Sequence, residues 1–431
     1  MIRNPTDPAA DSILRLSPFV AMRYGDETVP DIGAVTSPPY DVMDRAMIES
    51  LLNNHPRNIV RLILPRLVAD PMTGEDPYQR AAKLLERWRA ERVLVTEDAP
   101  ALYVYEYGDA RHHVCGLVGA LGLRDYSDRV VLPHEDVIDG IVDDRLAMLT
   151  AQGANLEPIM LVYDGQGETA EIFDRARARP PLIDVSAADQ TFHRLWAIDD
   201  PADLRRVADH LAPRQALIAD GHHRYAAYLR NRDRHHASGE QSGPWEAGLA
   251  LLVDQSQCPL QVGPIHRAIA DVTLAELLST AGDVGGIELG EVVALDGSLP
   301  QPSSRRGSFV VTEGERHATF SYATEACGTM SDAQVLHDVL IPALRIGEDR
   351  VSYHHTVDQA LSAAHQQGGV AVLMQPAGTA EVMSVAQAGL MMPRKSTSFG
   401  PKPRMGVVMR HLDDDAAMNL NAAPQRRGGD G

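Results

Sequence analysis

Apolar and polar positions along the chain follow two alternating patterns. Short apolar runs, such as ALYVYEY at 101–107 and EPIMLVY at 157–163, have the length and composition of buried strands. Between such runs, apolar residues recur every three or four positions, which is the spacing of an amphipathic helix. A chain that switches repeatedly between the two patterns is predicted to fold as an α/β (α+β) protein.

The same patterns predict the individual elements. Strands are predicted at 101–107, 113–121, 157–163, 192–198, 215–219 and 246–254. Helices are predicted at 143–152, 201–211 and 222–236. A further helix is predicted to begin at Asp76-Pro77, because an acidic cap followed by proline suits the first turn of a helix.

Two segments lack both patterns. Residues 295–308 (LDGSLPQPSSRRGS) are rich in Pro, Ser and Gly, and we interpret them as a loop or linker between sub-domains. Residues 411–431 show no periodicity, and we expect a disordered tail there. The chain has no internal repeat.

The composition is that of an ordinary globular protein. With 431 residues, 44% of them hydrophobic and 23% charged, the chain is long enough for two or three domains. No run approaches the roughly 18 apolar residues that a membrane span needs, and MIRNPTDPAADS at the N-terminus has no apolar segment. We therefore expect a cytoplasmic protein. The three cysteines form no C-x-x-C pair, which argues against a disulfide framework or a cysteine-based zinc site.

The net charge restricts the partners. A formal charge of −19 disfavours binding to nucleic acid and to anionic membranes, so we expect neither as a partner. A small anion such as phosphate must then be bound by a concentrated group of donors.

The segment LIADGHHRYAAYL contains such a group, between a predicted strand and a predicted helix. Asp220 and Gly221 form the expected connection, where glycine allows a tight turn that exposes the first N–H groups of the helix. A helix N-terminus favours an anion, and His222, His223 and Arg224 add donors for phosphate oxygens. The spacing alone is equally consistent with an Asp220 that only caps the helix and with solvated histidines.

Several stretches resemble the SerK-like free-serine kinases, in particular the long bacterial branch of that family. The stretches are SPPYDV (37–42), LPHEDVIDGIVDDRLAML (132–149), FHRLW (192–196), IADGHHRYAA (218–227) and PRKSTSFGPKPRMG (393–406). The resemblance implies the fold shared with ParB and sulfiredoxin. It implies a kinase core at 115–245, an N-terminal region at 1–114 packed on that core, and a C-terminal α/β region at 246–410.

The resemblance also implies an activity and the residues for it. Glu135 in the P-H-E triplet corresponds to the catalytic base, with His134 orienting it, and the loop from Asp220 to Arg224 corresponds to the nucleotide-phosphate site. The implied reaction transfers a phosphoryl group from ADP or ATP to the hydroxyl of free L-serine. Mg²⁺ is expected to bridge the phosphates, with Asp220 as a candidate ligand.

Two features leave an alternative open. Compared with the small kinases, this chain has long additional segments before the P-H-E triplet and after the D-G-H-H-R loop. Such additions can change the substrate, or turn the protein into a nucleotide-binding regulator without turnover. In an enzyme, Glu135 and the loop must face one cleft, so we expect them within roughly 12 Å of each other.

Further residues are candidates for substrate contacts. Tyr40 and Asp41 either line the cleft or belong to a rigid turn made by the preceding prolines. Arg145 either clamps a substrate carboxylate or pairs with the acidic residues before it. Lys395 lies in a polar segment that is either a phosphate contact or a solvated loop. His266-Arg267, which follow a predicted strand, are similarly open.

Two related activities are disfavoured by residues. Sulfiredoxin-like chemistry needs a cysteine in the loop, where this chain has histidine. A ParB-like DNA-binding protein needs a basic helix-turn-helix, for which the charge balance offers no evidence. The expected partners are therefore a nucleotide and a small-molecule substrate.

Overall fold

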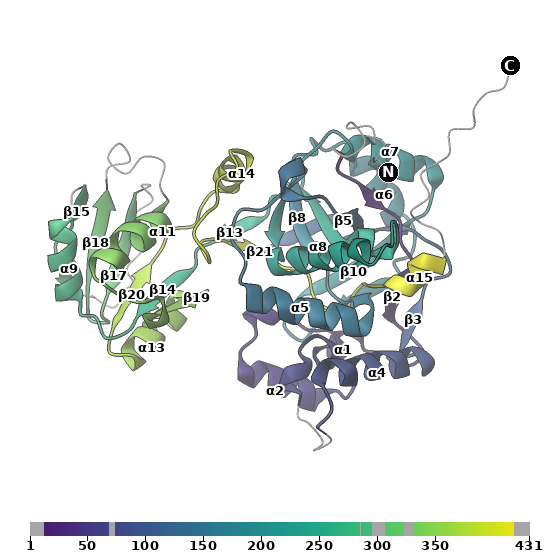
Figure 1. Ribbon diagram of the computed structural model, residues 1–431, viewed down its shortest axis with the longest axis horizontal. Coiled ribbons are helices and arrows are strands. Elements are labelled where there is room, and N and C mark those ends of the chain that lie inside the picture. Colours follow the sequence, from purple (N-terminus) through teal and green to yellow (C-terminus); the bar gives the residue numbers. More distant parts are fainter. Residues whose placement is uncertain (1–12, 69–73, 285, 295–306, 323–330, 418–431) are drawn as a thin grey trace. The chain divides into compact units, whose positions relative to one another are not determined.

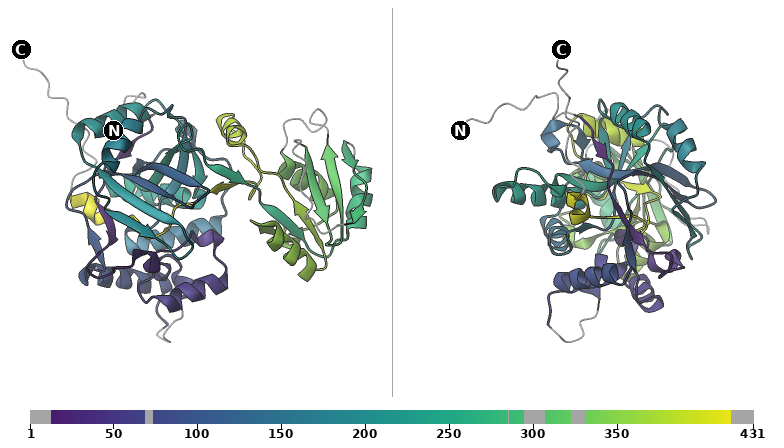
Figure 2. Two further views of the ribbon diagram at one scale, coloured as in Figure 1. Left: turned by 180° about the vertical axis from the view of Figure 1, so that it is seen from behind. Right: turned by 90° about the vertical axis from the view of Figure 1, so that its right-hand side faces the viewer.

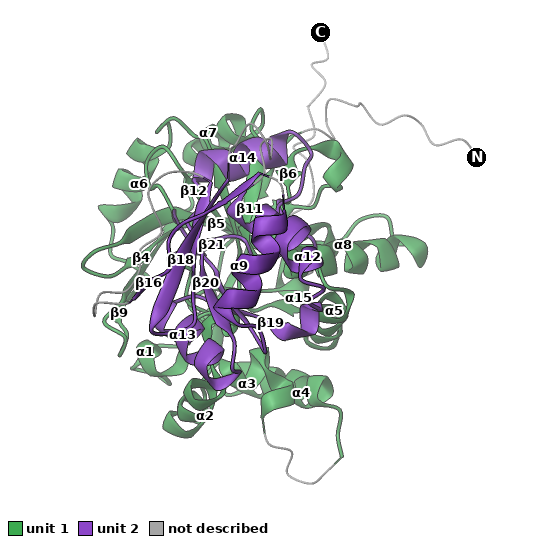
Figure 3. Cartoon of the chain, turned by 90° about the vertical axis from the view of Figure 1, so that its left-hand side faces the viewer, with its two compact units in different colours: residues 1–133, 137–260, 401–431 green, residues 134–136, 261–400 purple. Residues whose placement is uncertain are grey.

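A computed structural model describes residues 13–68, 74–284, 286–294, 307–322 and 331–417 (Figure 1). The chain forms two compact units (Figure 3). Unit 1 consists of residues 1–133, 137–260 and 401–431, and unit 2 of residues 134–136 and 261–400. Both contain helices and sheets, so the predicted α/β (α+β) class is confirmed.

The centre of unit 1 is a nine-stranded sheet with the order β6-β11-β8-β12-β5-β4-β10-β9, in which β1 also pairs with β5. The strands are β1 (Leu16–Ser17), β4 (Leu102–Gly108), β5 (His113–Gly122), β6 (Val131–Leu132), β8 (Ile159–Tyr163), β9 (Ile183–Ser186), β10 (Phe192–Ile198), β11 (Ala216–Asp220) and β12 (Ala247–Asp254). The β12–β8 and β11–β6 pairs are parallel and the others antiparallel. Every residue of β8 is buried, as expected for an apolar central strand.

Helices and a small sheet complete unit 1. The helices are α1 (Ile32–Val35), α2 (Arg45–Asn54), α3 (Val60–Ile63), α4 (Pro77–Ala90), α5 (Asp139–Gln152), α6 (Ala170–Arg177), α7 (Pro201–Leu211), α8 (His222–Ala237) and α15 (Leu412–Ala417). Short 3₁₀ turns are η1 (Tyr40–Val42), η2 (Pro65–Leu67), η3 (Tyr126–Asp128) and η4 (Pro244–Glu246). The small sheet has the order β3 (Leu94–Thr96), β2 (Ala21–Tyr24), β22 (Met409–His411) and β7 (Ala154–Asn155).

Helix α8 packs closely on the large sheet. It contacts β8, β12 and the neighbouring helix α5 (Figures 1 and 2). A Cβ atom added at Gly248 of β12 would lie 2.3 Å from Cδ2 of Tyr228 on α8, so this approach requires glycine. The close packing fixes the start of α8 relative to the end of β11.

Unit 2 has a seven-stranded sheet with the order β15-β18-β17-β20-β14-β19, in which β16 also pairs with β18. Its strands are β13 (Gln261–Gly263), β14 (His266–Ile269), β15 (Ile287–Leu289), β16 (Val293–Ala294), β17 (Ser308–Thr312), β18 (Arg316–Tyr322), β19 (Val351–His354), β20 (Val370–Leu373) and β21 (Ser398–Gly400), of which β13 and β21 form a separate pair. Its helices are α9 (Leu274–Asp283), α11 (Asp332–Gln334), the π-helix η5 (Val335–Leu340), α12 (Ile341–Ala343), the 3₁₀ turn η6 (Glu348–Arg350), α13 (Val357–Gln366) and α14 (Thr379–Gln387).

The predicted elements are confirmed to within a few residues. Strand β10 and helix α7 have the predicted bounds, and the other predicted strands differ by one or two residues. The helix predicted at Asp76-Pro77 is α4, in which the Asp76 side chain accepts a hydrogen bond from Gln79 N. In the described part of the chain, no helix has the length and apolar character to cross a membrane.

The two segments predicted to be irregular differ in outcome. The interpretation of 295–308 as a loop or linker falls mostly on residues 295–306, which lie outside the described residues; β16 before them and β17 after them both pair with β18. In the expected tail, residue 411 ends β22 and residues 412–417 form α15, so the prediction of disorder is wrong there. Residues 418–431 lie outside the described residues.

The compact units also divide the chain at other positions than those expected for the kinase core. The units meet at 260/261 and 400/401, and β12 is a central strand of unit 1, while the expected regions 1–114, 115–245 and 246–410 stay predictions. Residues 1–114 and 115–245 belong to one unit apart from 134–136. The assignment of a ParB/sulfiredoxin-like core stays a prediction.

Candidate functional site

The D-G-H-H-R turn has the strand-turn-helix form that the sequence predicts. Strand β11 ends at Asp220, α8 begins at His222, and Gly221 between them has a φ angle of +100°. A Cβ atom at this position would lie 2.8 Å from Cγ2 of Ile159 and 3.1 Å from Nε of Arg224. Glycine is thus required for the backbone conformation and for space. Helix α8 has 16 residues, and the positive end of its dipole lies at this turn.

Asp220 is held by two cations. Its Oδ2 atom accepts a hydrogen bond of 2.5 Å from Nη2 of Arg224, and Oδ1 lies 2.6 Å from Nζ of Lys402. Burial opposes ionisation of Asp220, but the positive charges of Lys402 and Arg224 outweigh burial and hold the pKa of the carboxyl well below its usual range. The bonds of Asp220 described here are to side chains, and Gly221 is the N-cap residue, so the alternative in which Asp220 caps α8 is not observed.

Arg224 connects this turn to a second buried carboxylate. Its Nη1 atom donates to the Pro158 carbonyl (2.6 Å) and lies 3.5 Å from Oε2 of Glu157. Burial raises the pKa of Glu157, although Arg224 and Arg145 act in the opposite direction. The environment therefore favours the neutral form of Glu157 more than an exposed site would.

Arg145 lies on the other side of Glu157. Its Nη1 atom is 3.7 Å from Oε1 of Glu157, and Nη2 is 2.5 Å from Oδ2 of Asp144. The guanidinium group stacks on the Tyr40 ring at 4.8 Å. Burial raises the pKa of Tyr40 to about 12. The neighbouring residue, Asp41, forms an ion pair with Lys402.

The structure thus joins residues from distant segments into one group of buried and half-buried side chains, which we call the charged cluster. Its members are Tyr40, Asp41, Asp144, Arg145, Glu157, Asp220, Arg224 and Lys402. Tyr40, Asp41 and Arg145, which the sequence predicts as separate substrate candidates, all lie with the Asp220–Arg224 turn. Their roles toward a substrate stay predictions.

Glu157 and Lys402 are the members that the sequence analysis missed. Glu157 looked like the first residue of a predicted strand, and Lys402 lies within a stretch quoted only for its resemblance. A charged residue directly before an apolar strand was a usable signal for Glu157. Lys402 meets Asp41 and Asp220 only in the tertiary structure, and local periodicity contains no signal for such a contact.

The two histidines of the turn are part of the protein framework. His222 is 3% exposed, and burial lowers its pKa to about 3, so it is neutral at physiological pH. Nε2 of His223 accepts a hydrogen bond of 3.0 Å from N of Ile138, the N-cap residue of α5. This bond ties the N-termini of α5 and α8 together.

His134 and Glu135 of the P-H-E triplet belong to unit 2, whereas Pro133 is the last residue of the preceding segment of unit 1. Oε2 of Glu135 accepts a hydrogen bond from N of Lys395 (3.1 Å), and the His134 carbonyl accepts one from N of Met392 (2.7 Å). Nε2 of His134 lies 2.7 Å from Oγ1 of Thr397. Glu135 and Lys395, which are both predicted site residues, therefore lie in contact within unit 2. Because the Asp220 turn lies in unit 1, its separation from Glu135 stays a prediction.

Asp220 does not fit the role of a magnesium ligand in this arrangement. Both of its carboxylate oxygens are bound to cationic side chains, and a Mg²⁺ ion would have to displace one of them. Over the described ranges, no group of three or more His, Cys, Asp or Glu side chains is placed to hold a metal ion.

Two surface depressions of unit 1 lie beside α6 and α7. One has a volume of about 510 Å³ and is lined by residues that include Thr169, Arg206 and His210; the other, of about 270 Å³, is lined by residues that include Arg175 and Asp203. None of the residues that line either depression belongs to the charged cluster. The chemistry of the cluster, and not the size of a cavity, singles out the region around Asp220.

Comparisons with known proteins give one family. The model of a family described as "Protein of unknown function (DUF1015)" matches residues 16–340. No curated protein matches the sequence.

Solved structures that resemble this chain include three at low identity. A free serine kinase in complex with AMP is 14% identical with a TM-score of 0.36, covering 66% of this chain and 90% of that one. SbnI with a C-terminal truncation from Staphylococcus aureus is 11% identical with a TM-score of 0.38, covering 67% and 84%. A conserved hypothetical protein from Pyrococcus furiosus is 15% identical with a TM-score of 0.35, covering 66% and 94%.

Proposed function

We propose that this chain, which belongs to the DUF1015 family because that family's model matches most of its length, is a nucleotide-dependent kinase of a small hydroxyl metabolite. The proposed reaction transfers a phosphoryl group from ADP or ATP to the hydroxyl of free L-serine. The observation that carries the proposal is the Asp220–Arg224 turn, where a 16-residue helix begins at a left-handed glycine beside buried cations.

This turn suits the phosphates of a nucleotide. The start of α8 presents backbone N–H groups and the positive end of the helix dipole, and Gly221 has no side chain to block a ligand. Arg145, Arg224 and Lys402 are buried nearby, where a low dielectric strengthens their attraction for an anion. Each of these three cations has an aspartate partner, and burial raises the pKa of the fourth carboxyl group, Glu157, which lessens the negative charge that an added phosphate would meet.

Glu135 is the proposed catalytic base, oriented by His134. As the serine oxygen attacks phosphorus, the new O–P bond forms, the bond to the nucleotide leaving group breaks, and the hydroxyl proton passes to the Glu135 carboxylate. ADP would leave AMP, and ATP would leave ADP. The bond from Lys395 N holds one carboxylate oxygen in place, which supports a fixed orientation of the base.

The substrate contacts are assigned to the charged cluster. Arg145 is the proposed partner of the serine carboxylate, with Tyr40 and Asp41 beside it, and Lys395 is the proposed phosphate contact from unit 2. Mg²⁺, when bound with the nucleotide, neutralises phosphate charge. The residues of the turn, Asp220 to Arg224, hold and orient the phosphates.

The decisive experiment separates binding from turnover. Purified protein is incubated with ADP or ATP, Mg²⁺ and a panel of small hydroxyl metabolites, and products are identified by mass. Phosphoserine is the expected product with one of the two nucleotides. Glu135→Gln should still bind nucleotide, while its turnover falls by a factor on the order of 10² to 10⁴, the usual contribution of a general base.

The alternative is a nucleotide-binding regulator without turnover. The occupation of both Asp220 oxygens by cations favours it, because the turn then offers phosphate donors without a free carboxylate. Nucleotide binding without any phosphorylated product across the panel would establish this alternative. Equal phosphoserine formation by wild type and Glu135→Gln would show that Glu135 is not the base.

A further inference from the structure

Residues 401–404 (PKPR) cross unit 1 as an extended segment, which we call the strap. Its backbone is bound by two tyrosines of β4: the Tyr107 hydroxyl donates to the Pro401 carbonyl (2.9 Å), and Arg404 N donates to the Tyr105 hydroxyl (3.3 Å). The Arg404 side chain donates from Nε to Oγ1 of Thr36 (2.7 Å). The strap is thus fixed to the sheet beside the charged cluster.

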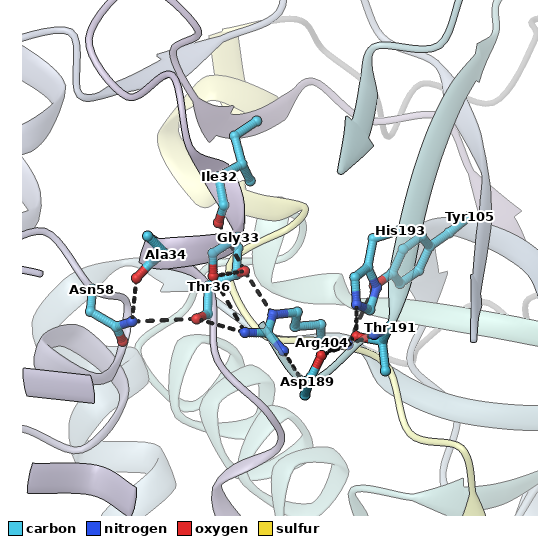
Figure 4. Close-up of polar contacts among 10 residues, drawn as sticks. All are labelled: Ile32, Gly33, Ala34, Thr36, Asn58, Tyr105, Asp189, Thr191, His193 and Arg404. Carbon is cyan, nitrogen blue, oxygen red and sulfur yellow. Dashed lines mark hydrogen bonds and ion pairs between the residues drawn. The ribbon is translucent and has the colours of Figure 1, made fainter. Parts of the chain in front are cut away.

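A chain of hydrogen bonds holds the Arg404 end (Figure 4). Nη1 of Arg404 donates to Asp189 (2.7 Å), whose other oxygen accepts from the Thr191 hydroxyl (2.5 Å). Because that hydroxyl donates to Asp189, it accepts from Nε2 of His193 (2.8 Å). Nδ1 of His193 then accepts from the Tyr105 hydroxyl (2.8 Å). Each hydrogen bond in this series therefore has a defined donor and acceptor. Together these bonds hold the Arg404 side chain in place.

At the other end, Lys402 connects two chain segments. Its Nζ atom forms ion pairs with Asp41 of η1 and with Asp220 at the end of β11. The Lys402 side chain is 10% exposed. Burial opposes its charge, but the two carboxylates outweigh burial and raise its pKa above the ordinary value. A cation shared by two carboxylates takes the place that a bridging metal ion has in other sites.

We propose that Lys402 is a positioning residue: an internal counter-cation that holds Asp41 and Asp220 together and thereby fixes the turn at the start of α8. The inference rests on the proposed function only in naming a nucleotide phosphate as the ligand of that turn. Titratable and charged groups from several elements act on Asp220. They are Tyr40 and Asp41 of η1, Tyr107 of β4, Glu157 before β8, His222 and Arg224 of α8, and Lys402 of the strap.

The substitution Lys402→Met tests this without any ligand. Two half-buried carboxylates, Asp41 and Asp220, would lose their shared cation, and one of them would take up a proton near neutral pH. The folded state would then bind more protons than the unfolded state, so stability would rise as pH falls from about 8 to about 6. In the wild type, Asp220 has a depressed pKa and contributes no such slope in this range. The measurement is the melting temperature of both proteins across this range.

Nucleotide binding gives a second readout. By calorimetry with ADP, Lys402→Met should bind about tenfold more weakly at about pH 8 and recover part of this loss at about pH 6, as protonation relieves repulsion. Lys402→Arg retains the cation and should lack the pH dependence. Lys83→Met is the matched control, because Lys83 pairs with Glu75 at 2.6 Å but its side chain is 71% exposed.

The outcomes separate the inference from the proposed function. A melting profile of Lys402→Met parallel to that of the wild type would overturn the positioning role. If Lys402→Met does not fold, the double variant Lys402→Met/Asp41→Asn, which keeps one carboxylate, should fold without the slope. Its failure to fold as well would also overturn the role. If the wild type binds no nucleotide but Lys402→Met shows the predicted pH dependence of stability, the proposed function is wrong and the positioning role of Lys402 is supported.

Discussion

Arg224 in unit 1 and Arg267 in unit 2 are both buried, but their positive charges are balanced differently. In unit 1, Arg224 lies between Asp220 at 2.5 Å and Glu157 at 3.5 Å. Burial opposes the charge of Arg224, but the two carboxylates outweigh burial and raise its pKa. The guanidinium group is therefore held in its charged form with counter-charges on both sides.

In unit 2, Arg267 of β14 is 0% exposed and has neutral partners. Its guanidinium donates to the Ile265 carbonyl and to Nε2 of His337 (3.2 Å), and it lies over the Tyr353 ring at 5.3 Å. Within the described residues Arg267 forms no ion pair. Burial lowers its pKa to about 10, with Tyr353 and Glu348 acting in the opposite direction.

The difference shows what the charged cluster adds. Removing several charges from water is expensive, and apolar side chains of similar volume stabilise a core at least as well. Unit 2 buries one cation with a carbonyl, a histidine and a ring. The charged cluster of unit 1 holds three cations with carboxylate partners beside a helix N-terminus. Stability alone does not explain the second arrangement, whereas the proposed binding of a nucleotide phosphate would.

The largest expected effect is that of Arg224→Ala. This change leaves Asp220 with one cation and weakens the compensation of Glu157, so we expect a loss of about 3 to 5 kcal/mol in the free energy of unfolding. Denaturant titration measures it, with ADP affinity as a second readout. A loss below about 1 kcal/mol would mean that the cluster is not maintained by these pairs.

The next effect is a pH dependence in the two histidines beside these arginines. Burial lowers the pKa of His222 to about 3 and that of His337 to about 4. A lowered histidine pKa contributes stability that is complete above the unfolded value of about 6.5 and is lost as pH falls toward the folded value. We expect His222→Gln to flatten the acid side of the stability profile by on the order of 2 kcal/mol. His337→Gln, at a less buried site, should flatten it less.

The third effect compares two glycines with similar backbone angles. Gly221 has φ +100° and tight neighbours, whereas Gly314 in unit 2 has φ +105° and no atom within 4 Å of an added Cβ. Gly314→Ala should cost about 1 kcal/mol, the price of a left-handed alanine. Gly221→Ala should cost about 2 kcal/mol or more, because Ile159 must also move. Equal melting temperatures for the two variants would contradict the crowding at the turn.

The smallest effect is expected for Arg267→Met. Because Arg267 has no carboxylate partner among the described residues, an apolar side chain of similar length removes a buried charge without leaving another charge unpaired. The free energy of unfolding should change by less than about 1 kcal/mol, or increase. A loss comparable to that of Arg224→Ala would show that the two arginines are equally important, and the contrast between the units would fail.

The sequence predicts local structure in this chain better than it predicts the candidate site. The bounds of β10 and α7 follow from apolar periodicity and from the Asp200-Pro201 start of the helix, where Asp200 caps the N-terminus. The turn at Gly221 was equally predictable, since strand, glycine and helix are adjacent in sequence. These elements depend on neighbours within a few residues.

The predictions that failed concern residues whose structure depends on partners distant in sequence. The acidic run Asp413–Asp415 favours disorder by its composition, yet it forms helix α15. Two arginines outside this run stabilise the helix, since Arg410 binds Asp415 and Arg89 binds Asp414. Lys402 was missed for the same reason, since its partners are distant in sequence.

The order in which the chain is synthesised gives the strap a further consequence. Unit 1 is interrupted after residue 260 and resumes at residue 401, so Lys402, Arg404 and β22 leave the ribosome only after all of unit 2. Until then Asp41 and Asp220 lack their shared cation, and the small sheet lacks the strand that joins β2 to β7. Domains generally fold as they emerge, N-terminal first. In this protein the first unit to begin folding is completed last, by its final residues.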